Sequence, residues 1–171
     1  MFILLNGPLG IGKSTLAEAL TESIEGCVML GGDSLLTVNP TPDDEVEYLH
    51  GLLGLLVAHH RRHGYRNFVI DHIWRSAADL ADLKTRVTTV DPRAAFRCFL
   101  LTLPESENVR RIERRQQARA IDDREFEWRM SAKERLALAA REDLGEPFDV
   151  SAPVPQLVAS LLERVGLTSE A

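Results

Sequence analysis

Short, almost wholly apolar runs alternate along this chain with longer segments in which apolar residues recur every three or four positions. A short apolar run bounded by glycine, proline or a carboxylate predicts a buried strand, and a period near 3.6 predicts an amphipathic helix. The predicted strands cover residues 2–6, 27–30, 67–71, 96–101 and 147–150. The predicted helices cover residues 14–24, 42–62, 76–90 and 153–165, and the strongly charged stretch 104–143 is also predicted to be helical.

Alternation of strands and helices over the whole length is typical of a parallel sheet covered by helices on both faces. The predicted fold class is therefore α/β, a three-layer sandwich. The 171 residues suit one domain with a sizeable core, and no internal repeat or linker divides them, so we expect a single domain over residues 1–171. Periodicity alone leaves the order of the strands open.

One helix start has a specific signal. Thr41 is a capping residue type, Pro42 suits the first helical position, and two aspartates follow in the first turn. These residues predict that the second long helix begins at Pro42 and ends near Arg62.

Residues 7–14 read Gly-Pro-Leu-Gly-Ile-Gly-Lys-Ser, the G-x-x-x-x-G-K-[ST] pattern of a phosphate-binding loop. A chance glycine-rich turn is the alternative, but here the loop stands between a predicted strand and a predicted helix, as the motif requires. Its backbone N–H groups and the helix N-terminus attract phosphate, Lys13 reaches the β- and γ-phosphates, and Ser14 holds Mg²⁺. The cofactors expected are ATP and Mg²⁺. The nucleotide-binding residues expected from the loop are Gly7, Leu9, Gly10, Ile11, Gly12, Lys13, Ser14 and Thr15.

Composition narrows the class of protein further. The net charge of −6 disfavours binding to nucleic acid or membranes through charge alone. The first apolar run is too short for a signal peptide, and no stretch is long enough for a membrane span. Cys27 and Cys98 have no metal-binding or redox spacing, so we expect free thiols and a cytoplasmic protein.

Asp33 is the first candidate for chemistry outside the loop. It follows the second predicted strand, behind Gly31 and Gly32, and ligands of open α/β sheets bind at the carboxyl ends of the strands. A carboxylate there orients a substrate hydroxyl or accepts its proton during phosphate transfer, which makes Asp33 a predicted catalytic residue beside Lys13. The alternative is a turn or helix-capping aspartate.

Asp71 ends the apolar run Phe68-Val69-Ile70, a pattern typical of a second Mg²⁺-site residue in phosphate-loop proteins. We expect Ser14 and Asp71 to organise the metal, with Asp71 acting through a water molecule or through Ser14. Hydrolysing ATPases commonly place glutamate next, whereas this chain has His72, and no Asn-Lys-x-Asp guanine motif is present. Both observations favour a transferase. His72 either contacts substrate or is a packed or capping histidine. Arg75 either contacts an anionic group of a ligand or is solvated.

An arginine-rich stretch is the third group of candidates. Guanidinium groups on a closing lid neutralise the charge that phosphoryl transfer spreads over the equatorial oxygens. Most of these side chains are expected to be solvated and paired with Glu107, Glu113 and Asp122. We predict that Arg111 binds nucleotide and that Arg115 and Arg119 are catalytic. The stretch consists of Arg110, Arg111, Arg114, Arg115, Arg119 and Arg124.

Taken together, these segments resemble the small P-loop kinases of the shikimate kinase, gluconate kinase and chloramphenicol phosphotransferase type. The resemblance covers nearly the whole chain. It departs from shikimate kinases, which have three glycines after the third strand, and from adenylate kinases, which have Asp-Gly-Phe-Pro-Arg. The matching segments are Gly7–Ser14, Gly32-Asp33-Ser34, Val69-Ile70-Asp71, the arginine-rich stretch and Phe148-Asp149-Val150-Ser151.

The resemblance implies five parallel strands in the order 2-3-1-4-5 and a lid, with its following helix, in residues 104–143. It also implies that residues 151–154 pass the adenine and that Asp33 faces the substrate hydroxyl. The expected function is ATP-dependent transfer of phosphate to a hydroxyl of a small metabolite or antibiotic.

Two alternatives stay open. One is a nucleoside or nucleoside-monophosphate kinase, and the other is an ATP-binding regulator or toxin-like phosphotransferase that acts on a partner. We expect a small-molecule acceptor, no nucleic-acid or membrane partner, and a monomer or homodimer.

Overall fold

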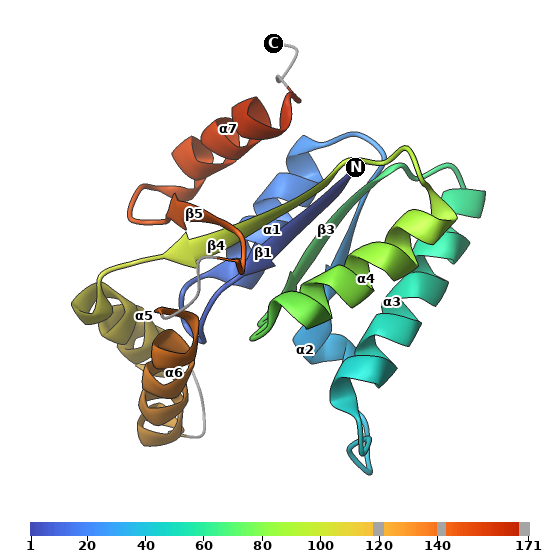
Figure 1. Ribbon diagram of the computed structural model, residues 1–171. Helices are drawn as coiled ribbons and strands as arrows, with labels where there is room; N and C mark the ends of the chain where they lie inside the picture. The colour runs from blue at the N-terminus through green and yellow to red at the C-terminus, as the bar shows by residue number, and fades with distance from the viewer. Residues whose placement is uncertain (118–121, 140–142, 168–171) are drawn as a thin grey trace.

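A parallel sheet of five strands runs through the centre of the computed structural model, which describes residues 1–117, 122–139 and 143–167 (Figure 1). The order of the strands is β2-β3-β1-β4-β5, which confirms the order that the resemblance implied. Every neighbouring pair is parallel. The strands are β1 Phe2–Asn6, β2 Cys27–Gly31, β3 Asn67–His72, β4 Phe96–Thr102 and β5 Glu146–Asp149.

Helices cover both faces of this sheet, which confirms the three-layer α/β sandwich. Figure 1 shows α1 and α7 on one face, α3 and α4 on the other, and α5 and α6 beyond the edge where the strands end. The helices are α1 Lys13–Ser23, α2 Gly32–Leu35, α3 Glu45–Arg62, α4 Ala77–Val90, α5 Glu105–Gln117, α6 Arg124–Ala139 and α7 Val154–Val165.

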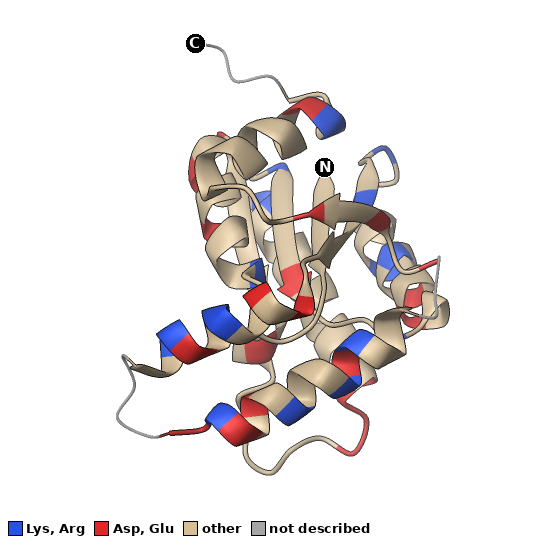
Figure 2. Ribbon diagram, turned by 90° about the vertical axis from the view of Figure 1, so that its left-hand side faces the viewer, with Lys and Arg blue, Asp and Glu red and all other residues tan. Residues whose placement is uncertain are grey.

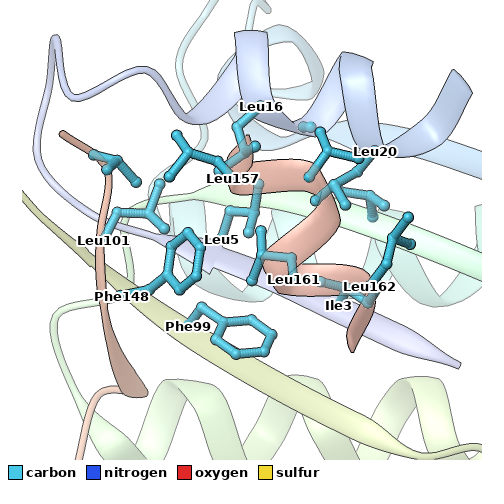
Figure 3. Close-up of a cluster of buried hydrophobic side chains, with 14 of the residues drawn as sticks. Ile3, Leu5, Leu16, Leu20, Phe99, Leu101, Phe148, Leu157, Leu161 and Leu162 are labelled. Carbon is cyan, nitrogen blue, oxygen red and sulfur yellow. The ribbon is translucent and has the colours of Figure 1, made fainter. Parts of the chain in front are cut away.

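The central strand β1 is buried along its whole length because alternate residues enter different cores. Ile3 and Leu5 pack under α1 and α7, where their side chains meet those of β4 and β5 (Figure 3). Phe2 and Leu4 pack on the opposite face, under α3 and α4. A strand buried on both faces needs apolar residues at every position, which explains the unbroken run Phe2-Ile3-Leu4-Leu5.

The predicted start of the second long helix is wrong. Helix α3 begins at Glu45 rather than Pro42, because the Asp44 carboxylate caps it by accepting the Glu47 N–H at 2.9 Å. Asp33, which was predicted only to follow the second strand, lies in the first turn of the short helix α2, for which Gly31 is the N-cap.

The register of the strands brings the candidate residues together. Gly31 of β2 and Leu5 of β1 both lie opposite Asp71 of β3, and Asn6 lies opposite His72. The phosphate loop follows β1, helix α2 follows β2, and Asp71 and His72 end β3. All of them therefore lie side by side at the carboxyl ends of neighbouring strands.

Two further observations bear on the predicted class of protein. Cys27 and Cys98 are free thiols, and burial raises the pKa of Cys98 to about 12. Within residues 1–117, 122–139 and 143–167, no helix combines the length and hydropathy that a membrane span requires.

Candidate active site

The phosphate loop depends on glycine at two positions. Gly10 and Gly12 have φ angles of 80° and 102°, a region that favours residues without a Cβ. A Cβ on Gly10 would also lie 2.5 Å from Ile112 Cγ1 of α5, so helix α5 packs directly on the loop. Gly12 is the N-cap of α1, which places the positive end of that helix beneath the loop.

Lys13 is folded back onto the loop. Its ammonium donates to the carbonyl oxygens of Gly7 at 2.9 Å and Pro8 at 3.2 Å, and the side chain is buried. Burial lowers the pKa of Lys13, while the nearby carboxylates of Asp33 and Glu134 oppose this shift. A desolvated ammonium of this kind gains much from an anionic partner.

Ser14 and Asp71 form the candidate metal site. The Ser14 hydroxyl donates to Asp71 Oδ2 at 2.7 Å, and Asp71 is only 4% exposed. Burial raises the pKa of Asp71, and the bond from Ser14 acts against that rise. Asp71 Oδ1 is buried without a hydrogen-bond partner among the described residues, as expected of an oxygen that awaits a metal-bound water.

These two side chains fit Mg²⁺ in the form used by phosphate-transfer sites. Mg²⁺ prefers oxygen ligands and usually keeps several water molecules, with one or two protein groups and the substrate phosphates completing its shell. Among the described residues, no group of three or more His, Cys, Asp or Glu side chains forms a metal site of its own. A Mg²⁺ ion at Ser14 and Asp71 would take its remaining ligands from nucleotide phosphates and water.

Asp33 lies in the first turn of α2 and is paired with His72. Imidazole Nδ1 of His72 lies 2.9 Å from Asp33 Oδ1, and this hydrogen bond is the main reason that the pKa of Asp33 is lowered. The Asp33 carboxylate is thus kept charged while most of its side chain is open to solvent.

The arginines of helix α5 differ in the groups that they bind. Arg111 bridges the phosphate loop and the end of β5, since it donates to Ile11 O at 2.9 Å and Val150 O at 2.7 Å. Arg115 donates to Glu127 of α6 at 2.6 Å, while its Nε is buried without a hydrogen-bond partner among the described residues.

The remaining arginines have the exposed ion pairs expected of a charged helix face. Arg110 and Arg114 both pair with Glu107, and Arg124 pairs with Asp122. Figure 2 shows the resulting mixture of basic and acidic residues along α5 and α6. Arg119 lies outside the described residues.

A cleft of about 680 Å³ brings most of the predicted site together. Its walls are the loop from Leu9 to Thr15, Asp33, residues 150–154, and Arg111, Arg114 and Arg115. Gly7 lies beneath the loop, where its carbonyl binds Lys13, and Asp71 lies behind Ser14. Residues 151–154, which the resemblance placed beside the adenine, line the end of the cleft near Arg111.

Sequence reasoning missed the polar contacts that join α5 and α6 to the loop. Glu134 of α6 accepts the Leu9 N–H at 2.7 Å, and Asn108 of α5 donates to the Leu9 carbonyl at 3.2 Å. Glu134 also pairs with Arg75, so that arginine is not simply solvated. The sequence holds one signal for these contacts. The buried residues of α6 recur at helical spacing, and most of them are polar: Glu127, Ser131, Glu134 and Leu138.

The fold and this cleft define a P-loop nucleotide-binding protein. Residues 2–140 match the family model described as an AAA domain, and the chain belongs to this family. A search of the curated proteins gives no match.

Solved structures of the same fold include small kinases. The tunicamycin resistance protein of Deinococcus radiodurans is 18% identical, with a TM-score of 0.68 over 98% of this chain and 96% of that one. A gluconokinase from Sinorhizobium meliloti 1021 is 18% identical, with a TM-score of 0.64 over 96% and 94%. A sugar kinase from Janibacter sp. HTCC2649 is 15% identical, with a TM-score of 0.67 over 97% and 94%. These likenesses confirm the predicted fold of the small P-loop kinases.

The contact of Glu134 with the loop generates a prediction about stability. Glu134→Ala removes the acceptor of the Leu9 N–H and one partner of Arg75, so we expect the free energy of unfolding to fall by about 1–3 kcal/mol. Glu134→Gln keeps an oxygen for the N–H and should lose less. Urea unfolding measures both, with Glu125→Ala on the exposed side of α6 as the control, expected within about 0.5 kcal/mol of the parent. An alanine variant as stable as this control would show that the contact does not form in solution.

Proposed function

We propose that this chain is a Mg²⁺-dependent phosphotransferase that moves the γ-phosphate of ATP to a hydroxyl group of a small molecule. The position of Asp33 carries the proposal. Its exposed, charged carboxylate lines the same cleft as Lys13 and the phosphate loop, where an acceptor hydroxyl must approach the γ-phosphate. A protein that only binds nucleotide would tolerate the loss of this carboxylate, whereas a phosphotransferase would not.

The nucleotide is expected to extend along the cleft from the loop to residues 151–154. Loop N–H groups and the N-terminus of α1 favour the phosphates, and Lys13 exchanges the Gly7 and Pro8 carbonyls for phosphate oxygens. Arg111, which is held between Ile11 and Val150, lies where the base and ribose enter. Mg²⁺ bound by Ser14, Asp71 and the phosphates would neutralise the developing charge.

The transfer itself needs positioning more than covalent chemistry. The acceptor oxygen forms a bond to the γ-phosphorus as the bond from that phosphorus to the β–γ bridging oxygen breaks, and ADP leaves. Asp33 orients the hydroxyl and accepts its proton. His72 occupies the position after Asp71, where hydrolysing ATPases commonly have a glutamate that activates water, and this difference favours transfer over hydrolysis.

Charges around the acceptor side favour a hydroxyl compound over a nucleoside monophosphate. A monophosphate acceptor requires cations for its own phosphate. Arg75, the cation considered for that role, is engaged by Glu134, and Asp33 adds a negative charge nearby. The similar structures described as a gluconokinase and a sugar kinase act, by their names, on hydroxylated compounds, which supports the same choice.

We propose that only one part of the lid moves and that the turn of α5 in contact with the phosphate loop stays in place. Helix α5 is fixed at Asn108, Arg111 and Ile112 by contacts with Leu9, Ile11 and Gly10. Closure over the nucleotide is therefore expected beyond this anchored turn. Arg115 would then exchange Glu127 for the γ-phosphate, aided by an Nε that has no partner among the described residues in this state.

The proposal is tested by incubating the protein with γ-labelled ATP, Mg²⁺ and a panel of sugars, other hydroxylated metabolites, antibiotics, nucleosides and nucleoside monophosphates. We expect labelled phosphate on a hydroxyl compound. Transfer only to a nucleoside monophosphate would establish the alternative kinase class. Tight ATP binding without transfer to any compound would favour a regulator or an enzyme that acts on a protein partner.

Lys13→Ala should weaken Mg²⁺-ATP binding and abolish transfer. Loss of one charge-assisted contact with phosphate corresponds to about 1.5–3 kcal/mol, or roughly one to two decades in affinity. Isothermal calorimetry measures the affinity, with Lys133→Ala on the exposed surface of α6 as the matched control. Equal affinities in the two variants would remove the loop from the nucleotide site.

Arg115→Ala should lower kcat by roughly 10-fold or more while ATP affinity changes by less than about threefold, because its contact with phosphate matures only in the transition state. Arg110→Ala is the control on the same helix, since Arg110 is exposed and pairs with Glu107. Single-turnover kinetics separate the two parameters. An unchanged kcat would assign Arg115 to the α5–α6 contact alone.

A further inference from the structure

The pair formed by Asp33 and His72 is a consequence of strand order. Strands β2 and β3 are neighbours, and Gly31 lies opposite Asp71, so the residues that follow the two positions meet at the sheet edge. Their polar atoms are 2.9 Å apart, at Asp33 Oδ1 and His72 Nδ1.

The His72 ring has little freedom at this position. A Cβ on Gly32 would lie 2.7 Å from Cβ, Cγ and Nδ1 of His72, so the ring packs directly on a glycine backbone. On another side, the Trp74 ring meets it edge-on, with centroids 5.5 Å apart. Trp74 is itself held because its N–H and its carbonyl both bind the buried Asn6 side chain at 3.0 Å.

Exposure separates the roles of the two side chains. Asp33 is 71% exposed and lines the cleft, whereas His72 is 16% exposed and lies behind it. The carboxylate is therefore the group that meets an acceptor, and the imidazole supports it from the protein side.

We propose that His72 is a positioning residue, whose Nδ1–H holds Asp33 Oδ1 so that Oδ2 faces the acceptor hydroxyl. The inference rests on the proposed function, because it assigns to Asp33 the orientation that phosphate transfer needs. The arrangement is that of a carboxylate and an imidazole in which the hydrogen bond fixes the orientation of both groups. Loss of the bond leaves a carboxylate that samples several rotamers.

Two amide substitutions separate positioning from space filling. In His72→Asn the side-chain nitrogen can occupy the place of Nδ1, while in His72→Gln it reaches the place of Nε2. Glutamine is closer to histidine in size, so a role in packing alone would favour His72→Gln. We expect the opposite order. His72→Asn should retain transfer within about threefold, and His72→Gln should lose roughly 10-fold or more in kcat, the size of one charge-assisted hydrogen bond, with unchanged Mg²⁺-ATP affinity.

The Asp33→Asn variant distinguishes failure of this inference from failure of the proposed function. Full transfer by Asp33→Asn would remove Asp33 from the reaction and overturn the proposed function. A loss of about 10²-fold in Asp33→Asn, together with equal transfer by the two His72 variants, would overturn the inference alone. In the Asp33→Asn background, His72→Gln should add no further loss.

A second readout is independent of the acceptor. Nitrogen-15 NMR of the imidazole in its neutral form reports which ring nitrogen carries the proton. We expect His72 to carry it on Nδ1, and in Asp33→Ala, which removes the acceptor, to shift toward the Nε2–H form. A wild-type ring protonated on Nε2 alone would overturn the inference whatever the transfer assay shows.

Discussion

Parallel pairing of β1 with β3 and β4 is the constraint on which the rest of the structure depends. Because β1 is central and its neighbours run the same way, everything that follows Asn6, Gly31 and Asp71 emerges at one edge of the sheet. Strand pairing alone therefore brings three groups close together: the phosphate loop, the carboxylate proposed for the acceptor and the candidate metal site. The apolar side chains of Figure 3 hold this edge in place from one face.

Leu9, a residue of the phosphate loop, links this loop to helices α5 and α6. Its N–H is bound by Glu134 of α6 and its carbonyl by Asn108 of α5, so both backbone groups of one loop residue are held from outside the loop. Ile112 packs where Gly10 has no side chain. The parts of α5 and α6 that contact Leu9 and Gly10 are thus fixed to the phosphate loop, and the movement that we propose for the lid is confined to the parts farther from it.

The features that sequence predicted well are local ones. The loop motif, the apolar run of β1 and the aspartate near the end of β3 each depend on neighbouring residues, and the strand order followed from the resemblance that they carried. Contacts across long separations were not predictable: Glu134 with Leu9 and Asp33 with His72 depend on helix packing and strand register. The start of α3 was misplaced because Pro42 and Asp44 offer competing start signals, and capping by Asp44 prevails.

The central claim is that this sheet edge presents ATP phosphates to an acceptor held by Asp33. A crystal structure with a non-hydrolysable ATP analogue and Mg²⁺ tests it most directly. The account predicts phosphates on the loop from Leu9 to Thr15, with Lys13 moved from the Gly7 and Pro8 carbonyls to phosphate oxygens, and the base at residues 151–154. It also predicts that Asp33, still bonded to His72, faces the γ-phosphate. A nucleotide bound elsewhere, or an Asp33 turned away from the phosphate, would contradict it.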